Sequence, residues 1–226
     1  MDNPLVALVV PPMLIVPAMG LLSRVRSTSP LGCELRRKSL HISIGLAALT
    51  FPLLLTRPWM VVTALAAVAA WMICVRRIPY LRCRFGGVLH DAGRESHGEL
   101  YFAIALAWLL LADRAGPFQY VVPLLILTVS DAAAAVVGRS LPIGRFAVFG
   151  NSKSVSGSAA FLVTAFAITS TSLSMGTALS AGQVLMVSMV ISVATTVAEA
   201  VSVKGIDNLS VPLVAWLILS LVTHGA

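Results

Sequence analysis

The feature that most constrains this chain is a series of apolar segments that cover most of its length. They are residues 4–22, 40–56, 59–75, 98–112, 118–137, 158–175, 184–203 and 209–222. A bilayer span needs about 20 apolar residues, and shorter segments need bundle packing or local thinning of the bilayer. The sequence therefore predicts one domain, residues 1–226, that is an all-α polytopic integral membrane helical bundle of about seven or eight transmembrane helices.

Composition supports this interpretation. Of the 226 residues, 58% are hydrophobic and only 11% are charged, whereas a soluble domain carries about 25% charged residues. The net charge of +7 is compatible with nucleic-acid binding, but the positions of the basic residues argue against it. If the amino terminus lies outside and eight spans alternate, all sixteen lysines and arginines except Arg57 and Arg114 lie on the inner side. We therefore expect the loops 76–97 and 138–157, and the active site, to face the cytoplasm.

The first apolar segment, within residues 1–22, contains four prolines. Proline kinks or breaks helices, although membrane helices tolerate it better than soluble ones. We expect a span, with a re-entrant segment as the alternative that would leave seven spans. A signal peptide is disfavoured because no basic region leads the segment and no clear small-residue cleavage site follows it.

Two carboxylates lie inside apolar segments, where an ionised group is costly unless it is paired, metal-bound or in a wet cavity. Asp131 lies in the segment 118–137, and Glu199 lies near the end of the segment 184–203. Asp207 and Asn208 follow where the next helix begins, and helix capping alone explains one of them. Because Mg²⁺ prefers oxygen ligands and bridges phosphates, we expect Asp131, Glu199, Asp207 and Asn208 to be its ligands.

A basic cluster precedes the second apolar segment. At helical spacing, Glu34, Lys38 and His41 share one face, with Arg37 beside them. Cations beside an ionisable ring suit phosphate binding. A juxtamembrane anchor for anionic lipid headgroups explains the same pattern about as well, although such an anchor has no need for His41.

The loop 138–157 is rich in glycine and serine. Its candidate nucleotide-binding residues are Arg139, Lys153, Ser154 and Gly157, together with Arg37 of the basic cluster. Backbone NH groups, hydroxyls and a cation before a new helix are typical of anion binding. The alanines after Asp131 leave one flank of that helix open to a ligand or to another backbone. The spacing is not that of a Walker A loop, and a flexible hydrophilic connection is the alternative.

The cysteine and histidine patterns exclude other chemistries. The three cysteines form no CxxC pair, and the four histidines form no HExxH pair. Neither a disulfide framework, a structural zinc site nor a zinc hydrolase is therefore indicated.

Four motifs occur in order along residues 36–212. They are Arg37, Lys38 and His41 in an RKxxH pattern; Ser130 and Asp131 followed by alanines to Gly138 and Arg139; Lys153, Ser154, Gly157 and Ser158 in a KSxxGS pattern; and Glu199 followed by Asp207, Asn208, Leu209 and Pro212. The set resembles the polyprenol kinase family, which contains dolichol kinase, phytol and farnesol kinases and the CTP-dependent diacylglycerol kinase. Phosphatidate cytidylyltransferases are more distant relatives. The resemblance implies an integral membrane kinase that transfers the γ-phosphoryl group of a nucleotide, often CTP, to a lipid hydroxyl.

The expected mechanism follows from these residues. Mg²⁺ on the carboxylates, with Arg139, Lys153 and Lys38, would neutralise the nucleotide phosphates, so catalysis would be positioning and charge stabilisation. Either Asp131 or His41 would accept the proton of the lipid hydroxyl. The resemblance implies phytol, a longer polyprenol such as dolichol, or diacylglycerol as the acceptor. The rivals are a phosphatidate cytidylyltransferase that makes CDP-diacylglycerol, and a membrane transporter, which the nearly all-apolar outer halves of the helices disfavour.

Overall fold

The computed structural model describes residues 4–22, 29–81, 98–112, 118–149 and 151–224. Its helices are α1 (Pro4–Leu22), α2 (Pro30–Ala48), α3 (Phe51–Leu54), α4 (Pro58–Arg77), α6 (Gly98–Ala112), α7 (Phe118–Leu125), the π-helix η1 (Ile126–Ser130), α8 (Asp131–Ser140), α9 (Val155–Gly176), α10 (Ala181–Val201) and α11 (Asp207–His224). The predicted all-α class is confirmed, with one small addition. Two short strands, β1 (Arg145–Val148) and β2 (Asn151–Ser154), interrupt the helices.

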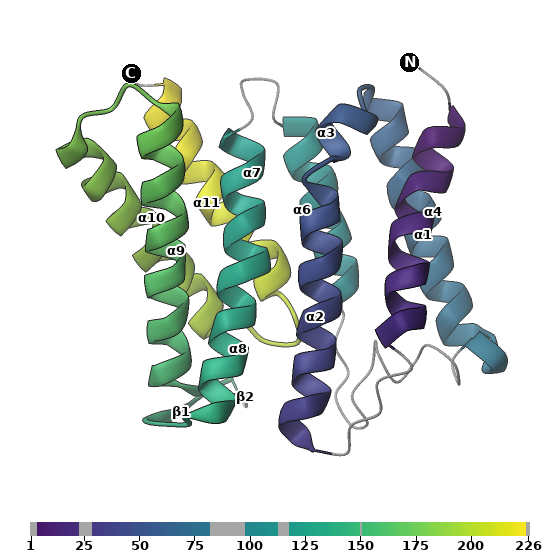
Figure 1. Cartoon of the computed structure of the whole chain (residues 1–226), viewed down its shortest axis with the longest axis horizontal. Helices are drawn as coiled ribbons and strands as arrows, with labels where there is room; N and C mark the ends of the chain where they lie inside the picture. The colour runs from purple at the N-terminus through teal and green to yellow at the C-terminus, as the bar shows by residue number, and fades with distance from the viewer. Residues whose placement is uncertain (1–3, 23–28, 82–97, 113–117, 150, 225–226) are drawn as a thin grey trace.

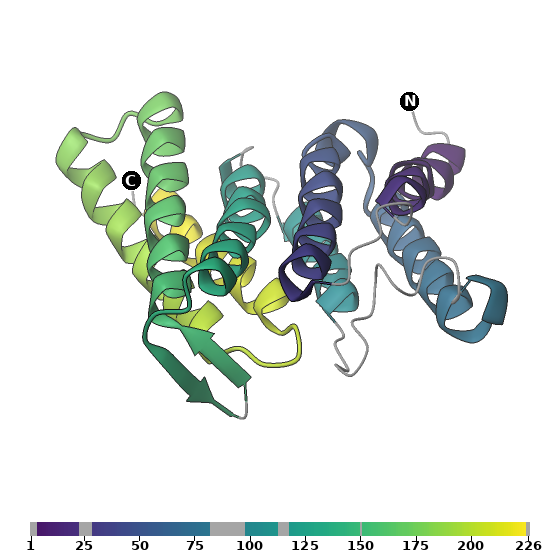
Figure 2. The ribbon, with the colours of Figure 1, turned by 60° about the horizontal axis from the view of Figure 1, so that its bottom comes forward.

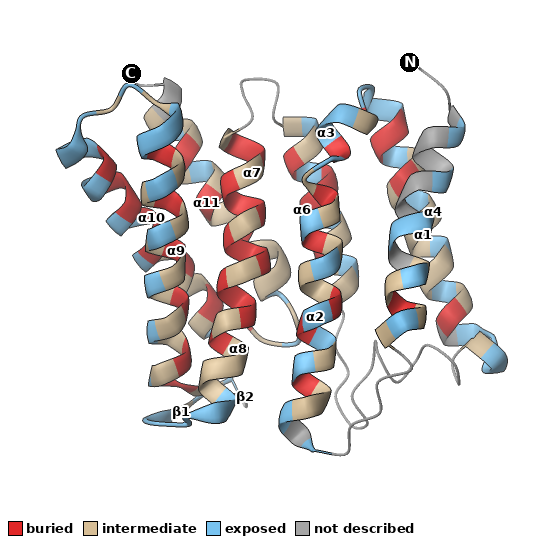
Figure 3. Ribbon diagram, in the orientation of Figure 1, coloured by how far each residue is buried: buried red, intermediate tan, exposed pale blue. Residues whose placement is uncertain are grey.

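The helices stand side by side, and most of them run along the same direction (Figure 1). In sequence order α7, η1 and α8 follow without a break and form the central rod of the bundle. Over an 18-residue stretch of Phe118–Ser140, 56% of the residues are buried, against 22% over a stretch of the same length in Val155–Gly176. Figure 3 shows this burial along α7. One apolar core joins α7 to α3, α4 and α6, and a second joins it to α9, α10 and α11.

Four described helices are long and apolar enough to cross a membrane, judged by length and composition. They are Pro58–Val75, Phe118–Ser140, Val155–Gly176 and Ala181–Val201, and two shorter apolar helices are Gly98–Ala112 and Asp207–Val222. Such helices indicate a membrane protein. The span count of seven or eight and the direction of insertion remain predictions.

The second apolar segment differs from its prediction. It was expected to be one span over residues 40–56, but α2 begins at Pro30, ends at Ala48, and is followed by the short α3. Ser29 starts α2 early because its hydroxyl accepts a hydrogen bond from the Gly32 backbone NH (3.0 Å), and a proline suits the first turn of a helix. The basic cluster therefore lies inside a helix, as its spacing predicted.

The central rod contains a π-helical turn where the sequence predicted an uninterrupted α-helix. Pro123 lies inside α7, where it supplies no backbone NH and its ring crowds the preceding turn. The π-helix η1 follows it and ends directly before Asp131. Single π-turns inside α-helices occur frequently at functional sites.

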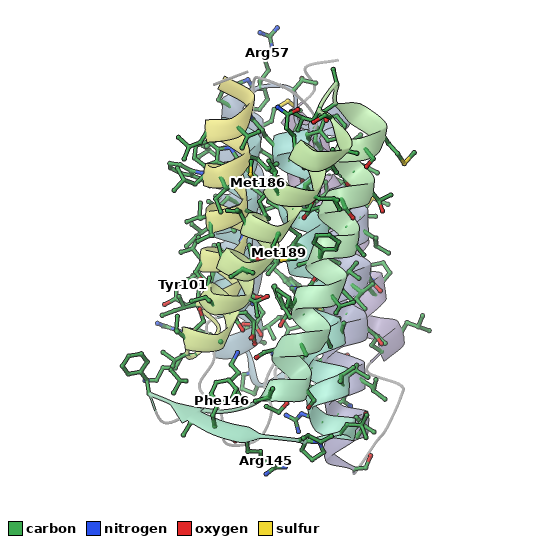
Figure 4. All side chains as sticks on the ribbon, turned by 90° about the vertical axis from the view of Figure 1, so that its left-hand side faces the viewer. Arg57, Tyr101, Arg145, Phe146, Met186 and Met189 are labelled. Atoms are coloured by element: carbon green, nitrogen blue, oxygen red, sulfur yellow. The ribbon has the colours of Figure 1, made fainter. Side chains whose placement is uncertain are left out.

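The predicted loop 138–157 is largely ordered secondary structure. Helix α8 extends to Ser140, and β1 and β2 then form an antiparallel hairpin in which Arg145 is opposite Ser154. The hairpin projects from one end of the bundle (Figure 2), and we call this end the hairpin end. Arg145 lies there and Arg57 lies at the opposite end (Figure 4). Of the loop predicted over residues 76–97, residues 82–97 lie outside the described residues.

Candidate active site

Asp131 and Lys38 form a buried ion pair. Lys38 Nζ of α2 donates to Asp131 Oδ2 at the start of α8, and the two side chains are 7% and 8% exposed. His41 Nε2 lies 3.6 Å from the same oxygen and 3.2 Å from the Leu127 carbonyl oxygen. Since a carbonyl only accepts, Nε2 carries the ring hydrogen in this contact. The three predicted catalytic residues are therefore brought together.

A glycine allows α2 to approach the central rod at this point. A Cβ atom built at Gly45 would lie 2.1 Å from Thr128 Oγ1 of η1, far inside the normal contact distance. Glycine is thus required where the two helices touch, one turn beyond His41. The same contact holds the basic face of α2 against η1 and Asp131.

Glu34 joins two arginines from different helices. Arg37 Nη2 donates to Glu34 Oε1 at 2.6 Å within α2, and Arg139 Nη2 of α8 lies 2.9 Å from Glu34 Oε2. Burial by itself raises the pKa of Glu34, which precedes the apolar part of α2. The charges of Arg37, Lys38 and Arg139 and the Arg37 hydrogen bond outweigh burial, so the pKa of Glu34 lies below its usual range.

Glu199 and Lys153 form a second buried pair, which connects the hairpin to α10. Lys153 Nζ on β2 donates to Glu199 Oε1 and to the Glu199 backbone oxygen, the latter at 2.9 Å. The side chain of Glu199 is 7% exposed. Its second oxygen, Oε2, is buried without a hydrogen-bond partner. Lys153 therefore neutralises a buried carboxylate and leaves one oxygen available to another ligand.

Ser154 and Gly157 have structural roles that the sequence did not separate from nucleotide binding. Ser154 caps α9, because its Oγ accepts a hydrogen bond from the Gly157 backbone NH (3.1 Å). A Cβ at Gly157 would lie 2.9 Å from the Ala134 carbonyl oxygen and 3.3 Å from the Gly138 Cα. The open flank after Asp131 is thus occupied by the backbone of α9. Whether either residue also contacts a nucleotide stays a prediction.

Asp207 and Asn208 begin α11 after a tight turn. Lys204 and Gly205 have positive φ values of 52° and 88°, which reverse the chain. Asn208 Nδ2 then donates to the Gly98 carbonyl oxygen at the start of α6 (2.9 Å). Asp207 lies within electrostatic range of Asp131, Lys38 and Lys153. Asp131, Glu199 and Asp207 therefore lie within electrostatic range of one another, whereas the side-chain amide of Asn208 bonds to the start of α6.

The described part of the chain holds no group of three or more histidine, cysteine, aspartate or glutamate side chains that could hold a metal ion. Instead, Asp131 pairs with Lys38, and Glu199 pairs with Lys153. Their oxygens nevertheless suit Mg²⁺, and Glu199 Oε2 is a buried oxygen without a partner. Mg²⁺ commonly takes only one or two carboxylates and completes its coordination with phosphate oxygens and water.

Sequence reasoning gave no role to two residues at this site. Glu34 was placed on the basic face, but its contact with Arg139 crosses 105 positions of the chain and left no local signal. Phe102 of α6 is the second, and its ring lies edge-on to His41 with centroids 5.2 Å apart. A role for Glu34 could have been inferred from its position one helical turn before Lys38.

Comparison with known proteins identifies the family. Protein-family models give no match, and no solved structure matches the chain. A phytol kinase from Synechocystis sp. is 31% identical over 204 residues, which cover 87% of this chain and 83% of that protein. With this identity and coverage, the chain belongs to the polyprenol kinase family that includes phytol kinase.

Proposed function

We propose that this protein is a membrane kinase that phosphorylates the hydroxyl group of a lipid alcohol, with CTP as the phosphoryl donor. The observation that carries the proposal is the Lys38–Asp131 pair with His41, beside a π-turn in the most buried of the four long apolar helices that the structure describes. The similarity to a phytol kinase makes an isoprenoid alcohol the first acceptor to test. The choice of CTP rests on the family resemblance.

In the proposed reaction the alcohol oxygen attacks the γ-phosphorus. A new O–P bond forms, the bond between the γ-phosphorus and the bridging oxygen breaks, and the nucleoside diphosphate leaves. Asp131 accepts the hydroxyl proton, because its carboxylate only accepts, whereas His41 Nε2 donates to the Leu127 carbonyl. Lys38 holds Asp131 in place and offsets its charge in the buried site.

Arg37, Arg139 and Lys153 would receive the nucleotide phosphates. Arg37 and Arg139 are 45% and 34% exposed, whereas Lys38 and Lys153 are mostly buried against carboxylates. Asp131, Glu199, Asp207 and Asn208 would hold Mg²⁺. When bound, Mg²⁺ would screen the phosphate charge as it develops on transfer.

The transporter interpretation requires a polar path beyond the carboxylates. Ser188, Ser192 and Thr195 do continue along α10 and are fully buried, so the outer half of this helix is less apolar than the sequence suggested. Ser192 and Thr195, however, donate to the Met189 and Ile191 carbonyl oxygens of their own helix, at 3.1 and 2.7 Å. The hydroxyls of Ser192 and Thr195 are satisfied locally, which favours a structural role for these two residues, whereas Ser188 Oγ is buried without a hydrogen-bond partner.

The decisive experiment is phosphoryl transfer by purified protein in liposomes. Wild-type protein with Mg²⁺ and γ-labelled CTP or ATP is tested against phytol, farnesol, a polyprenol, diacylglycerol and phosphatidate. We expect label on an alcohol, with an Asp131→Asn variant at least about 1,000-fold slower because the proton acceptor is lost. An Arg145→Gln variant at the exposed hairpin should keep the wild-type rate. Release of labelled pyrophosphate with phosphatidate would instead establish a cytidylyltransferase.

A further inference from the structure

Glu34 is a buried carboxylate to which the proposed reaction gives no chemical role. Its side chain is 4% exposed, yet both of its oxygens are occupied by guanidinium groups. Arg37 is three residues away on α2, while Arg139 comes from the last turn of α8. One carboxylate thus fixes the relative position of two cations from different helices.

Each arginine retains donors beyond the one used on Glu34. A guanidinium carries five N–H donors in a planar fork, and the contacts with Glu34 use Nη2 of each side chain. The two side chains are partly exposed while Glu34 is not. Among the described residues, the other guanidinium donors of the two arginines make no hydrogen bond. Two guanidinium groups positioned by one buried carboxylate therefore form a site for a polyphosphate.

The charge of the group supports the same role. Two arginines and one ionised glutamate leave a net charge of +1. The lowered pKa of Glu34 keeps the carboxylate ionised at neutral pH. Without that anion, the two cations would repel each other and separate. Arg37 also lies within electrostatic range of Asp131 and Asp207, so the group is connected to the carboxylates of the site.

We propose that Glu34 is a positioning residue that holds Arg37 and Arg139 as a clamp for the polyphosphate of the nucleotide. This inference rests on the proposed function and assigns its phosphate subsite. Glu34 does not contact the reacting atoms. Its loss therefore weakens nucleotide binding and leaves the rate of the bound complex nearly unchanged.

The test compares Glu34→Gln, Glu34→Asp and Arg139→Gln with the wild type. Two quantities are measured: KM and kcat for CTP at saturating alcohol, and the Kd of inorganic tripolyphosphate by titration calorimetry on the detergent-purified full chain. For Glu34→Gln we expect both KM and Kd to rise about tenfold or more, with kcat within about threefold, since a charge-assisted contact contributes this much. Glu34→Asp, which keeps the charge, should recover much of the affinity. Arg145→Gln, which removes one positive charge at the same end of the molecule, is the control for Arg139→Gln.

A double-mutant cycle separates positioning from general folding effects. If Glu34 acts through Arg139, adding Glu34→Gln to Arg139→Gln should weaken tripolyphosphate binding by much less than tenfold. Additive losses, an unchanged Kd in Glu34→Gln, or a loss confined to kcat would overturn the proposal. Tripolyphosphate binding needs no acceptor, so this inference can succeed or fail even if no alcohol is phosphorylated and the proposed function fails.

Discussion

At the scale of single residues, the site depends on pairs that no short stretch of sequence contains. Lys38 and Asp131 are 93 positions apart, and Lys153 and Glu199 are 46 apart. A carboxylate in an apolar segment indicates that a partner must exist. It does not say which of sixteen lysines and arginines supplies it. The sequence placed Lys38 and Lys153 against phosphates, whereas the structure places each against a carboxylate.

The Lys38–Asp131 pair leads to a stability prediction. Replacing Lys38 with Met keeps the volume but leaves Asp131 buried without its cation, which costs about 3–5 kcal/mol for a buried pair. We expect Lys38→Met to lose activity and to denature at a lower temperature, measured as monodisperse protein remaining after heating in detergent.

The double variant Lys38→Met/Asp131→Asn tests the cause. It removes both charges, so its thermal stability should return toward that of the wild type while it stays inactive. If Lys38→Met is as stable as the wild type, the Lys38 cation is not needed to stabilise the buried Asp131 carboxylate.

At the scale of elements, helix α2 packs closely against η1 where Gly45 meets Thr128. Gly45→Ala would place a methyl group within 2.1 Å of Thr128 Oγ1, so α2 must shift away from the central rod. Because Lys38 and His41 lie on the same helix, we expect a loss of activity of at least about tenfold, together with lower thermal stability.

Two further variants check this interpretation. Gly182→Ala adds the same methyl group on α10, where nothing lies within 4 Å, and should leave activity and stability unchanged or slightly improved. Combining Gly45→Ala with Thr128→Ala removes most of the clash and should restore part of the activity. Equal behaviour of the Gly45 and Gly182 variants would show that the contact does not position α2.

At the scale of the whole molecule, the bundle has two distinct ends. The hairpin with Arg145 lies at one end, and Arg57 lies at the other (Figure 4). Arg139 is in the last turn of α8 that leads into the hairpin, and Lys153 of the hairpin pairs with Glu199. The distribution of basic residues predicts that the hairpin end faces the cytoplasm.

Cysteine accessibility in intact cells tests this orientation. In a background without Cys33, Cys74 and Cys83, a cysteine replacing Arg57 should react with a membrane-impermeant maleimide, and one replacing Arg145 should react only after lysis. Activity of the cysteine-free background serves as the control for folding. The reverse labelling pattern would place the site on the outer side.

Sequence patterning was enough to establish the all-helical class of the molecule and to propose candidate residues for the site. Long apolar runs permit only helices that satisfy their own backbone hydrogen bonds. The 3.6-residue period placed Glu34, Lys38 and His41 on one face of a helix. The motifs also named Asp131, which the structure places beside Lys38 and His41. The ends of the helices were predicted less accurately, as in the segment 40–56. Ser29 and Pro30 set the start of α2, and after its end a separate helix, α3, begins with Pro52 in its first turn.

Which of these residues pair with one another depends on how the helices pack. Ion pairing between α2 and α8, or between β2 and α10, depends on helix contacts set by Gly45, Gly138 and Gly157, and such contacts depend on distance in space rather than along the chain. The π-turn before Asp131, the hairpin that carries Lys153 and the bridge from Glu34 to Arg139 arise in the same way. Charges in a buried site are stable only in the arrangement that neutralises all of them together, and that arrangement exists only once the helices have packed.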